Sequence, residues 1–195
     1  MTLPPDNSMR QTADIRQVLM DGGIELMGPE EAGIVFASPG RDDPDAAAVL
    51  LSVHACLKKH YGDREGRGVA SRLGRATFQY GLRRWGEAAG ITTPAFRLQP
   101  LPRKVRTVLS LLGEQLSRRF GSTVRLDEDE QNWTWRVEAC PVCTGGSGET
   151  PDCHLMAGML MELLTWAGSG RYFRVEEIEC AAAGAPGGSS TSRVV

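Results

Sequence analysis

The stretch STVRLDEDEQNWTWRVEAC, residues 122–140, is where the apolar pattern of the chain changes its period. On each side of an acidic turn, apolar residues alternate with polar ones; they are Val124, Leu126, Trp133, Trp135 and Val137. A period of two places alternate side chains on one face of a strand. The stretch therefore predicts a β-hairpin with one buried face.

Before the hairpin, apolar residues recur with the period of amphipathic helices. Three such helices are predicted, over residues 12–23, 42–62 and 103–121. Residues 24–38 are interrupted by glycine and proline and predict one or two short strands. The helix ends carry capping residues and glycines, which are Thr12, Gly22 and Gly23 for the first helix, Asp43 and Pro44 for the second, and Gly121 for the third.

A fourth helical pattern, over residues 66–90, contains glycines in its interior at Gly74, Gly81 and Gly86. An interior glycine costs about 1 kcal/mol relative to alanine, so repeated glycines need a reason. We expect them to permit the close approach of another helix or of a ligand, and tight helix packing is the simpler explanation. The arginines of the helix over residues 103–121 are most simply a solvated face.

After the hairpin, a helix that is apolar on nearly every side is predicted over residues 154–170, and a strand over residues 171–184. The order of helices, hairpin, helix and strand predicts an α+β fold, a small antiparallel sheet flanked by helices. We expect one domain over residues 11–185, with disordered ends over residues 1–10 and 186–195.

Composition places the chain among ordinary globular proteins. Of its 195 residues, 41% are apolar and 24% are charged, which excludes a disordered or fibrous class. A net charge of −2 gives no electrostatic reason to expect direct binding to nucleic acid or to an anionic membrane surface. No apolar run is long enough for a membrane span and the start lacks a secretory signal, so we expect a cytoplasmic protein with reduced thiols.

Three of the five cysteines fall in CPVCTGGSGETPDCH, residues 140–154. A CxxC pair ends the second strand of the hairpin, where a tight turn can present both sulfurs to one tetrahedral cation. A third cysteine begins the next helix and a fourth ends the last strand, so four thiolates could converge on a structural zinc ion. The candidate ligands are Cys140, Cys143, Cys153 and Cys180, with His154 and Glu177 as substitutes.

Two other interpretations of these cysteines stay open at this point. They could be buried free thiols beside a core. A redox pair is the third interpretation, but it expects the CxxC motif at the N-terminus of a helix, where the helix dipole lowers the thiol pKa. Here the motif is followed by the loop sequence TGGSGETPD, which disfavours a redox mechanism.

Aromatic and methionine side chains by default form a core, yet flexible apolar side chains also suit a pocket for an aromatic or hydrocarbon ligand. The candidate pocket residues are Tyr80, Trp133, Trp135, Met156 and Met159.

With these motifs in view, the chain resembles the 4-vinyl reductase domain family of small-molecule-binding proteins. The resemblance rests on CPVC, on the helix CHLMAGMLMELLTWAGSG that begins at Cys153, and on VEEIECAAAG, which carries a Cys-x-Ala-x-Gly signature. It implies an α+β fold related to vesicle-tethering TRAPP subunits, often a homodimer, with a buried pocket for apolar or aromatic ligands. Bacterial phenol sensors are among the relatives.

In those sensors, the resemblance implies, zinc is held by residues that match Cys153, Glu177 and Cys180 and by a further cysteine shortly after. That last position falls in GAPGGSS here and is not cysteine. Cys140 or Cys143 would therefore have to supply the missing thiolate. The departure also predicts that the final strand of the family is lost or altered.

These observations favour a non-enzymatic, stand-alone domain that binds a small hydrophobic or aromatic ligand and a structural zinc. The family name implies one alternative, an accessory protein or reductase acting on tetrapyrroles in bacteriochlorophyll-type synthesis. The tethering subunits imply another, a scaffold that recruits a protein partner. The sequence has no Rossmann fingerprint that would supply a hydride donor, which argues against the reductase.

Overall fold

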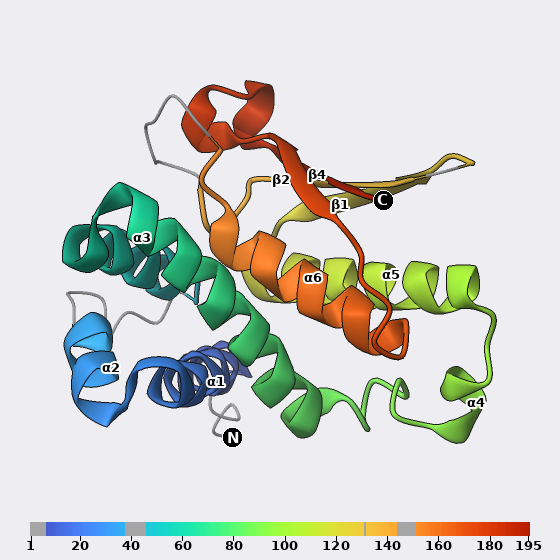
Figure 1. Cartoon of the computed structure of the whole chain (residues 1–195), viewed down its shortest axis with the longest axis horizontal. Coiled ribbons are helices and arrows are strands. Elements are labelled where there is room, and N and C mark those ends of the chain that lie inside the picture. Colours follow the sequence, from blue (N-terminus) through green and yellow to red (C-terminus); the bar gives the residue numbers. More distant parts are fainter. Residues whose placement is uncertain (1–6, 38–45, 131, 144–150) are drawn as a thin grey trace, which may run out of the picture.

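The computed structural model describes residues 7–37, 46–130, 132–143 and 151–195 (Figure 1). In these residues the chain forms six α-helices and one four-stranded antiparallel sheet, which confirms the predicted α+β class. The helices are α1 (Asn7–Met27), α2 (Pro29–Phe36), α3 (Ala46–Trp85), α4 (Pro94–Arg97), α5 (Leu101–Phe120) and α6 (His154–Ala167). The strands are β1 (Thr123–Glu128), β2 (Trp133–Glu138), β3 (Val175–Glu179) and β4 (Ser190–Val194), with two short 3-10 helices, Ala181–Ala183 and Pro186–Gly188, between β3 and β4.

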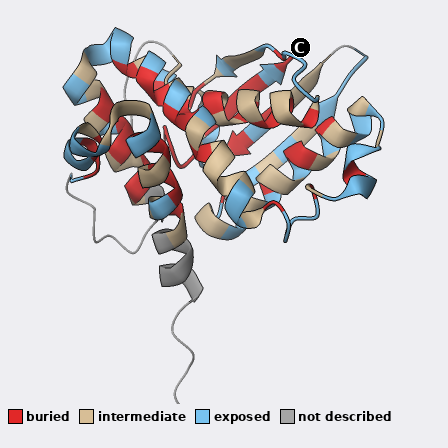
Figure 2. Cartoon of the chain, turned by 60° about the horizontal axis from the view of Figure 1, so that its bottom comes forward, coloured by how far each residue is buried: buried red, intermediate tan, exposed pale blue. Residues whose placement is uncertain are grey.

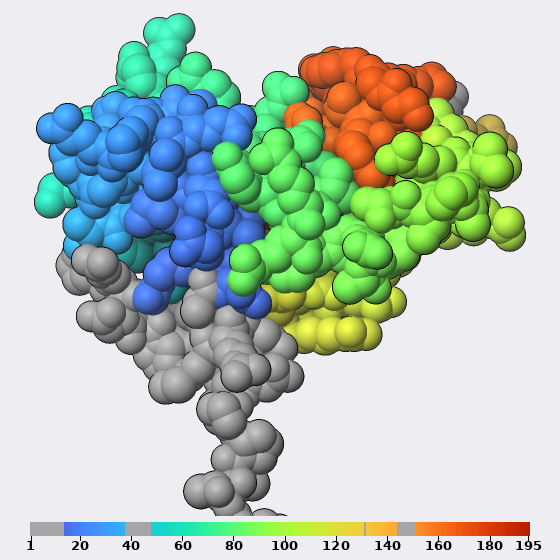
Figure 3. Space-filling view, turned by 90° about the horizontal axis from the view of Figure 1, so that it is seen from below, coloured from blue at the N-terminus to red at the C-terminus, as the bar shows by residue number. Residues whose placement is uncertain are grey.

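The helix α6 is the central element of the molecule. It packs along α3 on one side, and α5 and β3 contact it on others (Figure 1). The helix α3 in turn lies between α6 and α1, and α2 packs beside α1. Figure 3 shows α1 and α2 next to the C-terminal end of α3 on one face of the molecule. Buried residues follow the faces of the helices and strands that turn toward one another (Figure 2).

The predicted hairpin over residues 122–140 is confirmed. The strands β1 and β2 pair antiparallel, with Leu126 opposite Trp135 and Val124 opposite Val137. Trp135 and Val137 are buried, whereas Arg136 between them is exposed. The alternation in the sequence therefore marks the face of β2 that turns toward the core.

The prediction for residues 12–38 is wrong in two respects. The first helix does not end at Gly22 and Gly23 but continues to Met27, and the region predicted as short strands belongs to α1 and α2. A Cβ atom at Gly22 would lie 3.1 Å from the backbone nitrogen of Thr77, so this glycine allows close packing on α3. The chain instead turns at Gly28, whose φ of 85° is favourable for glycine, before the next helix begins.

Two predicted helices are joined in α3. Residues 46–85 form one continuous element with a kink at Gly62, where φ is 77° and ψ is 173°. The predicted cap residues Asp43 and Pro44 lie outside the described residues. The expected role of the interior glycines is confirmed at Gly74, where a Cβ atom would lie 2.0 Å from the carbonyl oxygen of Leu155 in α6. Only a residue without a side chain permits this crossing of α3 and α6.

The ends of the chain are more ordered than predicted. Residues 190–194 form β4, which lies between β2 and β3 in the sheet order β1-β2-β4-β3. The prediction of a disordered tail over residues 186–195 and of a lost final strand is therefore wrong. The hydroxyl groups of β4 find acceptors on β3, since Thr191 donates to Glu179 at 2.7 Å. At the other end, residues 7–10 already belong to α1, and residues 1–6 lie outside the described residues.

Candidate metal centre and apolar cavity

Four cysteines, Cys140, Cys143, Cys153 and Cys180, meet at one end of the sheet, and we refer to them as the thiol cluster. All four are buried, and none of them forms a disulfide. They come from the end of β2, the turn after it, the residue before α6 and the end of β3. The chain turns inward after β2 at Ala139, a non-glycine residue with φ 53°, whose carbonyl accepts a hydrogen bond from Ser122.

The sulfur atoms are close enough to share one cation. The Sγ atoms of Cys140 and Cys153 lie 3.3 Å apart, and those of Cys140, Cys143 and Cys153 all lie within 4.8 Å of one another. A tetrahedral zinc ion with Zn–S bonds of about 2.3 Å separates its sulfur ligands by about 3.8 Å. The observed spacing therefore fits zinc with only small movements of the side chains.

Cys153 also belongs to a second group of potential ligands, with Glu177 and Cys180, whose ligand atoms again lie within 4.8 Å of one another. Both carboxylate oxygens of Glu177 accept hydrogen bonds, one from the backbone N–H of Cys153 at 2.9 Å and one from Ser190 at 3.0 Å. Among the described residues, His154 is in neither group, although it stands next to Cys153. The sulfurs are thus better placed as ligands than either substitute.

Proton sharing within the thiol cluster produces negative charge on two of its sulfurs. Hydrogen bonds with Cys143 and Cys153 lower the pKa of Cys140 to about 4, and the hydrogen bond with Cys153 lowers the pKa of Cys180 to about 6. The pKa of Cys153 is raised because its proton serves these neighbours. Burial raises the pKa of Glu177 to about 7. A buried group of thiolates and thiols of this kind is a strong cation site.

Asp152, immediately before Cys153, ties the thiol cluster to α3. Its Oδ2 atom accepts a hydrogen bond from Nζ of Lys58 at 2.8 Å and lies 3.1 Å from Nε2 of His54. Its backbone N–H donates to the sulfur of Cys180 at 3.4 Å. Sequence reasoning missed this connection, because nothing in the spacing of His54 and Lys58 points to a residue nearly a hundred positions away.

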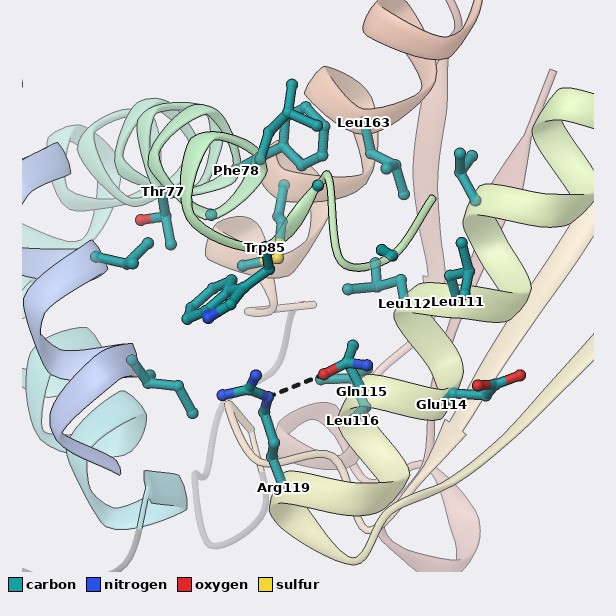
Figure 4. A pocket seen from close by; sticks show the side chains of 18 of the residues that line it. Thr77, Phe78, Trp85, Leu111, Leu112, Glu114, Gln115, Leu116, Arg119 and Leu163 are labelled. Carbon is teal, nitrogen blue, oxygen red and sulfur yellow. Dashed lines mark hydrogen bonds between the residues drawn. The ribbon is translucent and has the colours of Figure 1, made fainter. Parts of the chain in front are cut away.

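A separate cavity of about 590 Å³ lies between α1, the C-terminal half of α3, α5 and α6 (Figure 4). This volume is in the usual range of small-molecule sites. Its walls are mainly apolar, and polar side chains gather toward the C-terminal end of α5. Apolar lining residues include Leu19, Trp85, Leu112, Leu116, Met156 and Met159.

The predicted pocket residues divide between the cavity and the rest of the protein. Met156 and Met159 line the cavity. Trp133 and Trp135 do not, because β2 directs Trp135 into the core behind the sheet, where it is 1% exposed. Tyr80 does not either, since its ring lies under the guanidinium of Arg83, at 5.0 Å. Their assignment to this pocket is therefore corrected.

Two cavity residues were missed by the sequence analysis, Trp85 and Arg119. The arginines of α5 were assigned to a solvated face, but Arg119 is half-buried and lines the cavity. The signal was present in the sequence: Arg119 follows Leu112 by seven residues and Leu116 by three, which places it on the same helical face. The assignment of Arg119 to solvent is wrong for this reason.

Comparison with known families identifies the C-terminal part of the chain. Residues 133–187, from β2 through the second 3-10 helix, match the family model of the 4-vinyl reductase domain. The resemblance inferred from the cysteine motifs is thereby confirmed for this part of the chain, which is a 4-vinyl reductase domain with a buried thiol cluster that could hold a metal ion. No curated protein matches the chain.

The fold as a whole is shared with solved H-NOX proteins. An H-NOX protein from S. oneidensis in the Fe(II)NO ligation state has a TM-score of 0.62 at 11% identity, over 93% of this chain and 97% of that one. A mutant H-NOX protein from S. oneidensis in the Fe(II) state has a TM-score of 0.60 at 11% identity, over 93% of each chain. The IWP-051-bound H-NOX from Shewanella woodyi in the Fe(II)CO state has a TM-score of 0.53 at 10% identity, over 93% and 92%. At such identities the likeness establishes the fold alone.

The chemistry of the cavity has to be argued from its own residues. Among the described residues that line it, there is no histidine and no cysteine. The residues of the cavity therefore do not support iron coordination by an imidazole or a thiolate within it. No helix in the described parts of the chain has the length and apolar content that crossing a membrane requires.

Proposed function

We propose that this protein binds a small apolar or aromatic molecule in the cavity between its N-terminal helices, α5 and α6. The cavity of about 590 Å³ carries the proposal, because its walls are largely apolar and protein interiors rarely leave a space of this size empty. The match to the 4-vinyl reductase domain and the H-NOX fold support it, since the described H-NOX structures carry small ligands such as NO, CO and IWP-051.

A cavity-filling variant tests the ligand site. The probe is 1-aminoanthracene, a neutral aromatic molecule whose fluorescence rises in apolar surroundings. We expect it to bind the unaltered protein and to lose most of its affinity for Leu112→Trp, because the larger side chain occupies the cavity. The matched control is Leu98→Trp, at a side chain that is 86% exposed and outside the cavity. Equal binding by both variants would place the probe elsewhere and count against the proposal.

We further propose that the thiol cluster holds a zinc ion with a structural role. Four sulfur donors favour a soft, tetrahedral cation, and a site closed by four protein ligands leaves no position for a substrate. The three-sulfur group around Cys153 supports this assignment, and Cys180 contacts the same sulfur. Cys140 and Cys143 would then replace the thiolate that the phenol sensors supply from the position occupied here by GAPGGSS.

Metal analysis of protein purified without added metal tests the zinc assignment. We expect about one zinc ion per chain and, after removal of the metal under reducing conditions, four additional thiols that react with a thiol reagent. Protein that carries no stoichiometric metal, and whose four buried cysteines titrate freely from the start, would show that the thiol cluster consists of buried free thiols.

A further inference from the structure

Two arginines line the cavity, and they differ in their surroundings. The side chain of Arg118 is 70% exposed and pairs with Glu114 at 3.3 Å. Arg119 is half-buried: its guanidinium lies over the Trp85 ring, 4.7 Å from the centroid, and its Nε donates to Oε1 of Gln115 at 3.1 Å. Figure 4 shows Arg119 reaching from α5 toward Trp85 within the cavity. Arg119 therefore places a positive charge against an apolar space.

One donor of Arg119 lacks an acceptor within the described part of the chain. Its Nη1 atom is buried and makes no hydrogen bond. The nearby carboxylates have other partners, since Asp14 pairs with Arg84 and Glu114 pairs with Arg118. Burial lowers the pKa of Arg119 despite the charge of Asp14. A buried guanidinium donor without an acceptor is costly, and an anionic ligand would supply what it lacks.

We propose that the cavity selects a monocarboxylate with an apolar or aromatic body, whose carboxylate pairs with Arg119. This inference rests on the proposed ligand-binding function and adds the class of ligand. The guanidinium offers planar, paired donors that match a carboxylate, and stacking on Trp85 limits its movement. The body of the ligand lies toward Met156 and Met159 on α6, at the apolar side of the cavity.

The geometry gives the ligand a direction. Leu112, Leu116 and Arg119 follow one face of α5, so the wall of the cavity changes from apolar to cationic toward the C-terminal end of the helix. Glu114 and Arg118 at that end are exposed, which places the carboxylate near solvent and the apolar body deeper. A neutral molecule of the same shape would fill the space but leave the Nη1 atom of Arg119 without an acceptor.

A matched pair of ligands separates charge recognition from apolar binding. The pair is 1-naphthylacetate and its uncharged amide, 1-naphthylacetamide, measured at neutral pH by calorimetry and by displacement of 1-aminoanthracene. We expect the carboxylate to bind the unaltered protein about 10- to 100-fold more tightly, the usual contribution of a hydrogen bond to a charged group. Arg119→Gln should abolish this preference and leave the affinity for the amide unchanged.

Two variants control the experiment. Arg103→Gln removes an exposed charge from the same helix, away from the cavity, and should keep the preference for the carboxylate. Arg119→Lys keeps the charge but loses the planar donors and should retain part of the preference. Thermal unfolding verifies that each variant is folded, and the ratio of the two affinities in the unaltered protein decides the question even if Arg119→Gln does not fold.

The outcomes distinguish this inference from the proposed function. Equal affinity for the carboxylate and the amide, with 1-aminoanthracene bound, would overturn the carboxylate selectivity and leave the apolar site standing. A preference that persists in Arg119→Gln would also overturn it, because the charge would then be read elsewhere. If neither naphthyl ligand nor 1-aminoanthracene binds, both proposals fail.

Discussion

Cys153 hydrogen bonds with each of the other three buried thiols, so its sulfur is shared by both groups of potential metal ligands. Its position was predictable from the sequence, because a cysteine at the start of a helix and a CxxC pair at a strand end are local features. Their distances were not predictable, since they depend on how α6 and β3 pack against β2. The packing of Arg119 on Trp85 is non-local in the same way.

At this scale we predict that Cys143→Ser weakens zinc binding and stability together. A hydroxyl is a poor ligand for zinc in place of a thiolate, so zinc content should fall well below one per chain. We expect the free energy of unfolding to fall by more than about 2 kcal/mol, because folding and metal binding are coupled. Metal analysis and thermal unfolding provide the measurements.

The control for this prediction is Cys56→Ala, which changes the one cysteine outside the thiol cluster, on α3. It should keep the full zinc content of the unaltered protein. Loss of zinc from both variants, or from neither, would contradict the assignment of Cys143 as a ligand.

The crossing of α3 and α6 is the closest helix contact for which the glycines provide an explanation. A Cβ atom at Gly158 would lie 2.0 Å from the carbonyl oxygen of Ser71, and one at Gly74 would meet Leu155 in the same way. The interior glycines of residues 66–90 predicted a close approach, but only the structure identifies α6 as the partner. Leu155 and Met156 thereby reach the cavity, while Cys153 reaches the thiol cluster.

We therefore predict that Gly158→Ala destabilises the protein by at least about 2 kcal/mol, because the helices would have to separate. Gly68→Ala is the matched substitution in α3, at an exposed helical position where an added Cβ atom meets nothing within 4 Å. It should stabilise by up to about 1 kcal/mol, the helix preference of alanine over glycine. Chemical denaturation measures both, and similar effects of the two substitutions would contradict the crossing.

The strand β4 leads to a prediction that is opposite to the one from composition. Because β4 pairs with both β2 and β3, a chain that lacks residues 190–195 would leave two strands without their partner. We expect such a chain to lose cooperative thermal unfolding. Arg193→Ala, which removes only an exposed side chain and keeps the backbone pairing, should unfold almost as the unaltered protein does. A cooperative transition in the truncated chain would contradict the central position of β4.

The thiol cluster joins three segments that are distant in the sequence, at the ends of β2 and β3 and at the start of α6. A metal ion bound there would connect the sheet to the central helix. Asp152 extends the connection to α3 through Lys58. The stability of the whole molecule should therefore depend on the metal.

At the scale of the whole molecule, we predict that a chelator lowers the melting temperature by about 10 °C. The stabilisation by a bound ion grows with the ratio of free ion to dissociation constant and reaches about 4 kcal/mol at a thousandfold excess. For a chain of this size, each kcal/mol shifts the melting temperature by about 2–4 °C. Differential scanning calorimetry measures the shift, and added zinc should reverse it. Unchanged melting temperatures in chelator and in zinc would contradict a structural metal.

The sequence by itself determined the α+β class, the hairpin over residues 122–140, the helix α5 and the set of cysteines that meet. These features follow from local periods and from residue chemistry, which neighbouring residues along the chain are sufficient to specify. The tertiary structure alone decided three others: the strand β4, the place of the cavity and the burial of Arg119. A polar strand such as STSRV forms because β2 and β3 offer it partners, and an arginine is buried only where distant helices cover it. Long-range packing of this kind leaves no local pattern.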